Sequence, residues 1–355
     1  MNTKRNIITL GLILGNLLGA QTITTIITTT TAATPLVYPN CTTPNFAVPA
    51  KPKDTKRFVT GDQVKDSARK EIPTKEPVSA VYDGATIWVL TTGQEIVRLD
   101  PATTKPIESH YIPDASSFLL DGDNIWVGTT KAQLHRYSRS LRKVTLTVTL
   151  GTGSVIKGAT DGTNIVALSN GLVQLSATTF WKGMMTTVRP DGTYLTVGLS
   201  QSATTTQPEP VSFTLESGYA WIARADGTIL QVPVLPNGET QKKHDVDTDS
   251  GGIVDSVSDG ASVWIVNSGT GSVSRFDLQS KTLVSKIPGA PGAKKLLFDG
   301  TSLWVATTDR IVQFHGTDSR KLNELQIGTK PTALLFDGMK VWQADRLAGT
   351  LKQVQ

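Results

Sequence analysis

A single cysteine, Cys41, and four widely separated histidines are all that this sequence of 355 residues offers for thiol and imidazole chemistry. One cysteine excludes an intramolecular disulfide framework and a zinc site made of several thiolates, because each needs at least two sulfur atoms. Common catalytic signatures are also missing, among them a Gly-x-Ser-x-Gly elbow, a phosphate-binding loop and a dinucleotide fingerprint. We therefore assign no catalytic residue, no cofactor and no metal ligand from the sequence.

Charge is absent from a long stretch near the start, residues 6–50. The net charge of +5 arises around it: Lys4 and Arg5 precede it, and residues 51–76 hold eight basic and five acidic residues. Residues 77–355 hold 25 residues of each sign. A body that is formally neutral argues against nucleic acid as a partner.

Residues 1–20 have the pattern of an export signal. Two basic residues precede an apolar run from Ile7 to Leu18, and Ala20 ends a cleavage site. We predict a signal peptide over residues 1–20, with a second cleavage point at Ala33, and a protein that is secreted, periplasmic or on the cell surface. The alternative is an uncleaved membrane anchor, because the uncharged stretch is long enough to span a bilayer.

Threonine and proline dominate residues 21–66, which we interpret as a largely disordered linker. The prolines prevent this segment from propagating a helix or a central strand. Cys41 follows Tyr38-Pro39-Asn40, which lacks the small-residue pattern of a lipid attachment site. We interpret this cysteine as incidental.

A repeat organises the rest of the chain. Each copy has an acidic residue, usually followed by Gly, and a large apolar residue five positions after the acid. The seven pairs are Asp83 and Trp88, Asp121 and Trp126, Asp161 and Val166, Glu216 and Trp221, Asp259 and Trp264, Asp299 and Trp304, and Asp337 and Trp342. Because Asp-Gly favours tight turns, each copy predicts a strand, a turn and a second strand.

A third strand is predicted after the second, with Arg or Gln at its third position in every copy. These residues are Arg98, Arg136, Gln174, Gln231, Arg275, Gln313 and Gln353. A fourth strand follows in most copies, for example residues 282–287. Four short strands in each repeat of about 40 residues are typical of a β-propeller blade. We predict an all-β fold, a seven-bladed propeller of four-stranded antiparallel blades over residues 67–355, in which each Trp packs against the next blade.

Two parts of the chain depart from the repeat. The last copy ends one strand short, and we predict that residues 67–72 supply this strand and close the ring. Successive acids are 38, 40, 55, 43, 40 and 38 residues apart, so one interval is too long. We favour an insertion at residues 176–210; the alternative is a degenerate eighth blade around Asp191-Gly192.

The segment from Val263 to Ser274, and Leu303-Trp304-Val305-Ala306-Thr307, resemble the repeats of bacterial exported propellers of the YVTN class, which includes YncE-like and surface-layer-type proteins. The resemblance covers residues 67–355 and implies a repeat scaffold, not a particular activity. The repeats are also similar to those of streptogramin B lyase propellers, which are metal-assisted enzymes. Those carry Glu three residues after the Trp, whereas Thr91, Thr129 and Thr307 stand here, so no catalytic residue is carried over.

Loops between second and third strands, and loops between blades, share one face of a propeller and converge on the channel mouth. These loops hold basic and polar residues that suit a polar ligand. The predicted ligand-binding residues are Arg224, Asn267, Lys295, Arg310, Lys330 and Arg346, among further charged residues that include Lys157, Lys294, Asp226, Asp309 and Asp345.

Residues 245–251 have the alternating oxygen-bearing residues of a calcium loop but lack its closing Glu, so a divalent cation there is the one cofactor alternative. The sequence predicts a monomeric binding scaffold outside the cytoplasm for a small polar ligand, a glycan or a protein. We expect a membrane as a partner only if the N-terminal segment is not cleaved. The alternative function is a metal-dependent enzyme of the lyase or lactonase type.

Overall fold

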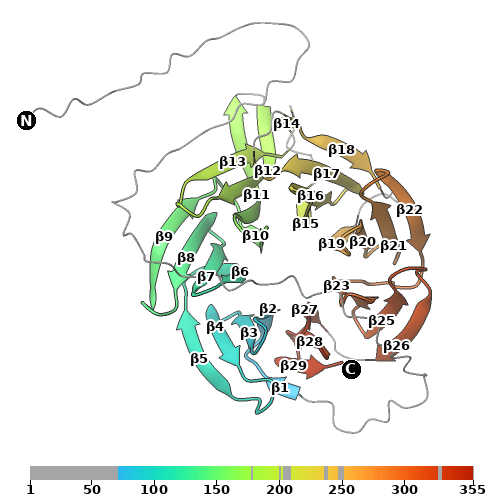
Figure 1. Cartoon of the computed structure of the whole chain (residues 1–355), viewed down its shortest axis with the longest axis horizontal. Helices are drawn as coiled ribbons and strands as arrows, with labels where there is room; N and C mark the ends of the chain where they lie inside the picture. The colour runs from blue at the N-terminus through green and yellow to red at the C-terminus, as the bar shows by residue number, and fades with distance from the viewer. Residues whose placement is uncertain are drawn as a thin grey trace, which may run out of the picture.

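The computed structural model describes residues 71–176, 179–199, 201–202, 209–235, 239–246, 252–326 and 330–354. These residues form seven antiparallel sheets in a ring, with the first strand of each sheet at the centre and the fourth at the rim (Figure 1). The seven-bladed β-propeller predicted from the sequence is confirmed. Within the described ranges no helix is long and apolar enough to cross a membrane. The predicted signal peptide, the linker and Cys41 lie outside these ranges.

We number the sheets as blades 1 to 7 along the chain; in most of them four consecutive strands pair in order from the channel outward. Blades 1 to 3 contain β2 (Pro77–Tyr82), β3 (Ile87–Thr91), β4 (Glu95–Leu99) and β5 (Pro106–Tyr111); β6 (Ala115–Asp121), β7 (Asn124–Thr129), β8 (Gln133–Ser138) and β9 (Lys143–Thr149); and β10 (Val155–Thr160), β11 (Ile165–Ser176), β12 (Thr179–Val188), β13 (Tyr194–Gly198) and the short β14 (Gln201–Ser202), which pairs with β12.

Blades 4 to 7 follow the same plan. They contain β15 (Pro210–Glu216), β16 (Tyr219–Arg224), β17 (Thr228–Pro233) and β18 (Lys242–Asp245); β19 (Ile253–Ser258), β20 (Ser262–Asn267), β21 (Val273–Asp277) and β22 (Thr282–Ile287); β23 (Lys295–Phe298), β24 (Ser302–Ala306), β25 (Arg310–His315) and β26 (Lys321–Gln326); and β27 (Pro331–Phe336), β28 (Val341–Asp345), β29 (Thr350–Gln353) and β1 (Glu71–Pro73).

The repeated acids have two roles at the first turn of a blade. In blade 1, Asp83 Oδ1 accepts hydrogen bonds from the backbone N–H groups of Ala85 and Thr86, at 3.0 and 2.7 Å. Its second oxygen, Oδ2, accepts a hydrogen bond from Trp88 Nε1 at 2.7 Å. Burial acts to raise the pKa of Asp83, but these bonds outweigh it and hold the pKa below its ordinary value. The indole bond, which the turn signal alone did not indicate, explains the fixed spacing of five residues.

The same indole bond to the acid occurs in blades 2, 5, 6 and 7, and each of these Trp side chains packs against the following blade. Trp88, fully buried, lies in one cluster with Phe118 and Ile125 of blade 2. Trp342 of blade 7 lies with Ile87 of blade 1. The predicted packing of each Trp against the next blade is confirmed, so one residue joins the turn of its own blade to the core of the next.

We expect Asp83→Ala to lower the free energy of unfolding by about 2 kcal/mol, because it leaves the buried Trp88 Nε1 without an acceptor. Asp191 is a matched control: it forms an Asp-Gly turn with Thr193 but accepts no indole bond. Asp191→Ala is expected to cause a clearly smaller loss in urea denaturation. Equal losses in the two variants would contradict the role given to the indole bond.

The Arg or Gln predicted on the third strand pairs directly across from the Trp in six blades, and it is the fourth residue of its strand in all of them except β21. Arg98 and Arg275 are examples: their guanidinium carbons lie 5.5 and 5.0 Å from the ring centroids of Trp88 and Trp264. A cation over an indole ring adds stabilisation beyond burial. These positions therefore cover the outer side of the Trp.

Blade 3 corrects this assignment for Gln174. This residue lies on the extended second strand, β11, and pairs with Phe180, whereas Thr187 of β12 stands opposite Val166. Gly171 lies within β11, where a Cβ would come 1.8 Å from the Thr152 carbonyl oxygen, so the backbones of these two residues approach closely.

The long interval between repeats holds no eighth blade among the described residues. The predicted insertion at 176–210 is in part the third and fourth strands of blade 3, and Asp191-Gly192 forms the turn between them. The extra length lies in the outward extension of β11 and β12, which projects from the ring in Figure 1. Residues 177–178, 200 and 203–208 lie outside the described ranges.

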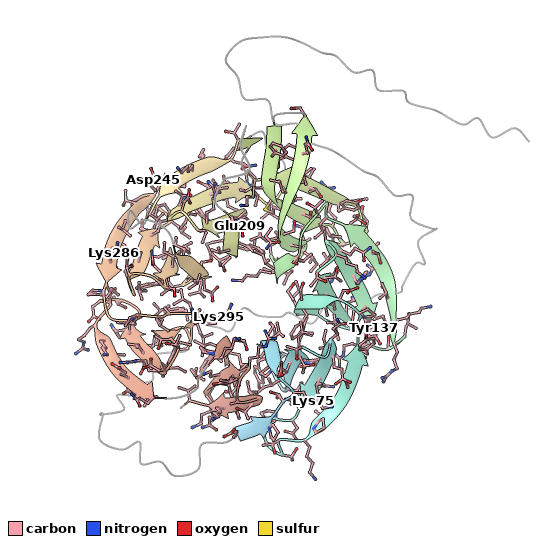
Figure 2. All side chains as sticks on the ribbon, turned by 180° about the vertical axis from the view of Figure 1, so that it is seen from behind. Lys75, Tyr137, Glu209, Asp245, Lys286 and Lys295 are labelled. Carbon is pink, nitrogen blue, oxygen red and sulfur yellow. The ribbon has the colours of Figure 1, made fainter. Side chains whose placement is uncertain are left out.

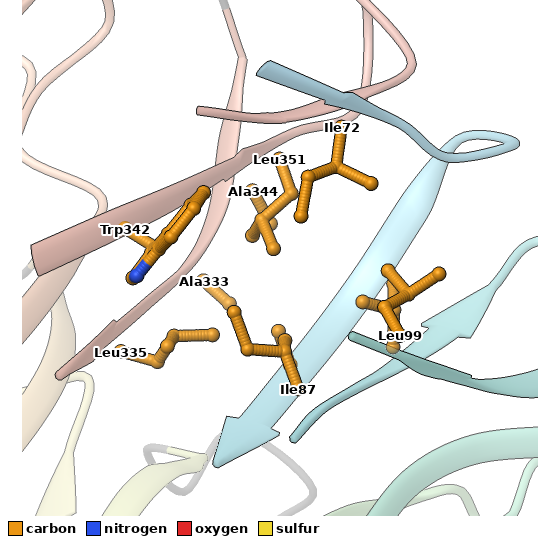
Figure 3. Close-up of a cluster of buried hydrophobic side chains, with 10 residues drawn as sticks. Ile72, Ile87, Leu99, Ala333, Leu335, Trp342, Ala344 and Leu351 are labelled. Carbon is orange, nitrogen blue, oxygen red and sulfur yellow. The ribbon is translucent and has the colours of Figure 1, made fainter. Parts of the chain in front are cut away.

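The ring closes as predicted, with β1 as the outermost strand of blade 7. Ile72 pairs with Leu351, and both side chains are fully buried. Figure 3 shows these two side chains together with Trp342 of blade 7 and Leu99 of blade 1. Of the predicted segment 67–72, only residues 71 and 72 are described, and the strand continues to Pro73.

Candidate functional site in the central channel

Seven equivalent positions border the central channel, each four residues before the turn acid of its blade. We name them the channel ring: Ser79, Ser117, Lys157, Ser212, Asp255, Lys295 and Ala333. In six blades a register shift lies immediately before the ring position, and such β-bulges re-aim the side chain that follows. The first strands that carry the ring contact one another in succession around the channel.

Three ring positions are charged: Lys157 of blade 3, Asp255 of blade 5 and Lys295 of blade 6. The other four are Ser or Ala. The ring positions of blades 1, 2, 4 and 7 are therefore uncharged. The charged ring residues all lie between blades 3 and 6. We name Lys157, Asp255 and Lys295 the channel charge cluster.

Asp255 is the centre of this cluster and is only 8% exposed. Its Oδ1 accepts hydrogen bonds from Ser212 Oγ of blade 4 and from the backbone N–H of Ser256, both at 2.9 Å. Its Oδ2 accepts the backbone N–H of Leu296 of blade 6 at 3.1 Å. One carboxylate thus connects three blades.

Burial acts to raise the pKa of Asp255, but Lys295, Lys157 and the hydrogen bonds together lower it below the ordinary value. The carboxylate is therefore ionised at neutral pH. Its two oxygens have protein donors, so it stabilises the channel wall and does not need a further ligand.

Lys157 reaches across the channel wall from blade 3. Its Nζ donates hydrogen bonds to Ser212 Oγ at 2.8 Å and to the Ser256 carbonyl oxygen at 3.3 Å, and lies 3.9 Å from Asp255 Oδ1. Burial lowers the pKa of this amine, opposed by Asp255. The Lys157 side chain as a whole is 36% exposed.

Lys295 lies at the central opening (Figure 2). Its ammonium group forms no hydrogen bond or ion pair with any of the residues that the structure describes, although its charge contributes to lowering the pKa of Asp255. The formal charges of Lys157, Lys295 and Asp255 sum to +1. A net charge in a partly desolvated channel attracts an ion of the opposite sign.

The loops predicted to share one face do so. In blades 1, 2, 4, 5 and 7 a backbone hydrogen bond joins the loop after the second strand to the loop that enters the blade, for example Arg346 N to Lys330 O at 3.0 Å and Ala225 N to Glu209 O at 2.9 Å. The same pattern links Ser268 N to Gly252 O at 2.8 Å. We name this side the loop face.

The residues predicted on the loop face are not brought together into one site. Arg310 pairs with Asp309 and with Glu324 on the outermost strand, so its guanidinium is turned away from the channel. Arg346 lies 3.7 Å from Glu76, and Lys330 is exposed. Of the six residues predicted to bind a ligand, Lys295 alone belongs to the channel charge cluster; Lys157, named among the further charged residues of these loops, belongs to it as well.

Two predicted residues are buried. Arg224 ends β16, is 5% exposed, and has Asp226 Oδ2 3.9 Å from its guanidinium. Asn267 is 1% exposed, and its Oδ1 accepts the backbone N–H groups of Gly269 and Thr270 at 2.9 and 3.1 Å. That pattern is an Asx turn, so the Asn267 side chain shapes its own loop.

Sequence reasoning missed Asp255 and Ser212 as members of a site, and it placed Lys157 in a loop, although it lies on β10. A signal was available. Counting back four residues from each repeat acid yields Ser, Ser, Lys, Ser, Asp, Lys and Ala, and three charges at one register position of the innermost strand are unusual.

The cation alternative at residues 245–251 falls largely outside the description, because only Asp245 and Val246 are described there. Asp245 Oδ1 lies 3.5 Å from Lys243 Nζ. Across the described part of the chain, no group of three or more His, Cys, Asp and Glu side chains is placed to hold a metal ion.

No family model matches the sequence, and no curated protein does. Among solved structures, 1587 chains match the fold significantly. One is the crystal structure of the computationally designed Ika8 protein, at a TM-score of 0.58 and 12% sequence identity, covering 80% of this chain and 98% of that chain. At this identity the similarity shows the propeller fold and nothing about activity.

Proposed function

We propose that this protein is an exported β-propeller that acts, as a monomer, as a binding module outside the cytoplasm and receives a polar ligand at the loop face and central channel. The observation that carries the proposal is the channel charge cluster, which three blades build at one level of the channel. Its residues are Lys157, Asp255 and Lys295.

Stability alone does not account for this cluster. Desolvating charged groups is costly, and replacing buried ion pairs by apolar residues is often neutral or stabilising. The equivalent positions in blades 1, 2 and 7 are Ser79, Ser117 and Ala333, so the ring is compatible with small uncharged residues there. A function that needs charged groups in the channel explains why the ring positions of blades 3, 5 and 6 carry charged residues.

Export rests on the signal-like residues 1–20, and the scaffold role rests on the resemblance of residues 263–274 to exported propellers of the YVTN class. Secretion, the periplasm and the cell surface are all compatible with this proposal. The ligand classes are a small polar molecule, a glycan or a protein. Cell fractionation of the full chain, with the N-terminus of the exported form read by mass spectrometry, tests this part.

The binding proposal is tested by screening the exported protein on glycan and peptide arrays and then repeating the screen with Lys157→Met and Lys295→Met. We expect a ligand of the wild type to be lost or weakened about tenfold or more in both variants, because each removes a charged donor. Lys143→Met is the control, since Lys143 is exposed on the outermost strand of blade 2. A ligand that both variants bind as the wild type does would overturn the channel as its site.

A further inference from the structure

The channel charge cluster has donors to spare. An ammonium group carries three N–H donors, and Lys157 uses two of them on Ser212 and the Ser256 carbonyl. Lys295 uses none on the residues that the structure describes. Asp255, in contrast, has its oxygens engaged by Ser212, Ser256 and Leu296. The cluster can therefore donate hydrogen bonds to an acceptor on a ligand. It has little capacity to bind a hydrogen-bond donor or a cation.

The part of the ring away from these donors carries no charged side chain. Lys157, Ser212, Asp255 and Lys295 occupy four consecutive blades, while the remaining arc of blades 7, 1 and 2 carries Ala333, Ser79 and Ser117. All three side chains of that arc are small. Ser117 Oγ donates to the Val155 carbonyl oxygen, whereas the Ser79 hydroxyl has no partner among the described residues. A ligand beside the lysines would thus face small groups and one available hydroxyl.

We infer that the channel binds one carboxylate group of a small hydroxy acid, with the carboxylate between Lys295 and Lys157 and a ligand hydroxyl near Ser79. The net charge of +1 selects a monoanion, because a carboxylate neutralises it, whereas a phosphate dianion would leave an excess negative charge beside Asp255. Lysine donors satisfy carboxylate oxygens through charge-assisted hydrogen bonds. This inference rests on the proposed function and names the ligand class of the same site.

The test is isothermal titration of the exported protein with gluconate, a hydroxylated monocarboxylate, at low ionic strength. Sorbitol, which has the hydroxyls without the carboxylate, and inorganic phosphate are titrated in parallel. We expect one gluconate per chain, bound about tenfold or more tightly than sorbitol. Equal affinity for gluconate and sorbitol would overturn the carboxylate assignment, and tighter binding of phosphate would overturn the monoanion.

Lys295→Gln is the decisive variant, because this side chain has no structural partner among the described residues and its loss leaves Asp255 with all three of its hydrogen bonds. It is expected to weaken gluconate binding about tenfold, while Lys143→Gln leaves it unchanged. Wild-type affinity in Lys295→Gln would overturn the placement of the carboxylate.

Failure of this inference is distinguishable from failure of the proposed function. If gluconate does not bind but an array ligand is lost in Lys157→Met and Lys295→Met, the channel binds a ligand of another class and the carboxylate inference is overturned. If gluconate does not bind and both variants bind the array ligands as the wild type does, the channel site is overturned as well.

Discussion

Asp255→Ala is expected to lower the free energy of unfolding by about 3–5 kcal/mol, the range observed when one partner is removed from a buried ion pair. The change leaves the ammonium groups of Lys157 and Lys295 close together without a counter-charge. It also removes the acceptor of the Ser212 hydroxyl and of the Leu296 backbone N–H, which connect blades 4, 5 and 6. Urea denaturation at pH 7 measures the loss.

Ser79→Ala is the control at an equivalent ring position, because the Ser79 hydroxyl has no hydrogen-bond partner among the described residues. It is expected to change stability by less than about 0.5 kcal/mol. A loss of under about 1 kcal/mol in Asp255→Ala would contradict the view that this carboxylate holds three blades together.

The same interaction has a definite pH dependence. The pKa of Asp255 is lower in the folded protein than in the unfolded chain, so its contribution to stability is complete above the unfolded pKa and declines as pH falls through the folded pKa. The difference in unfolding free energy between the wild type and Asp255→Asn is therefore expected to be full at pH 7 and to shrink below about pH 4. A difference that grew on acidification would show the opposite sign and would be incompatible with an ionised carboxylate.

Ile72→Ala is expected to lower the free energy of unfolding by about 2–4 kcal/mol, because it removes a fully buried side chain from the seam between blades 7 and 1. This effect is large for a strand of only three residues. Because β1 pairs with β29 over so few residues, its attachment depends strongly on the buried Ile72 side chain. Loss of this cover exposes an unpaired edge, and we expect the variant to aggregate at lower temperature than the wild type.

The neighbouring Glu71 provides a matched control on the same strand. Its carboxylate lies 3.7 Å from Lys352 Nζ and its side chain is 48% exposed, so Glu71→Ala removes only a surface ion pair. Such pairs contribute at most about 1 kcal/mol. Thermal and urea unfolding of both variants should separate them clearly; similar midpoints would show that β1 is not needed to close the ring.

The fold could be predicted because its information is local and repeated. An acid, a tight turn and a large apolar residue five positions later, Trp in six of the seven copies, define both the first hairpin of a blade and its contact with the next blade. Closure by β1 was predictable from the missing last strand. The assignment of Gln174 was wrong because the second strand of blade 3, β11, continues to Ser176, and the repeat spacing does not reveal this extension.

The candidate site was predicted less well, because side chains on loops were chosen by their place in the chain and not by their partners. Arg310 and Asn267 lie where the topology puts them, but nearby groups in their own blades engage their polar atoms. The channel charge cluster depends on contacts between residues up to 99 positions apart, such as Lys157 and Ser256, and only their shared register reveals them in the sequence.

The closing strand β1 also determines where the two ends of the propeller lie relative to the loop face. Thr74 bonds to Gly349 in the loop after β28, and from there β1 leads back to Glu71, which pairs with Lys352 near the end of β29, so both described ends of the propeller lie on the two outer strands of blade 7, toward the side away from the loop face. A fusion or an immobilising tag at either end therefore leaves the loop face and the channel mouth accessible.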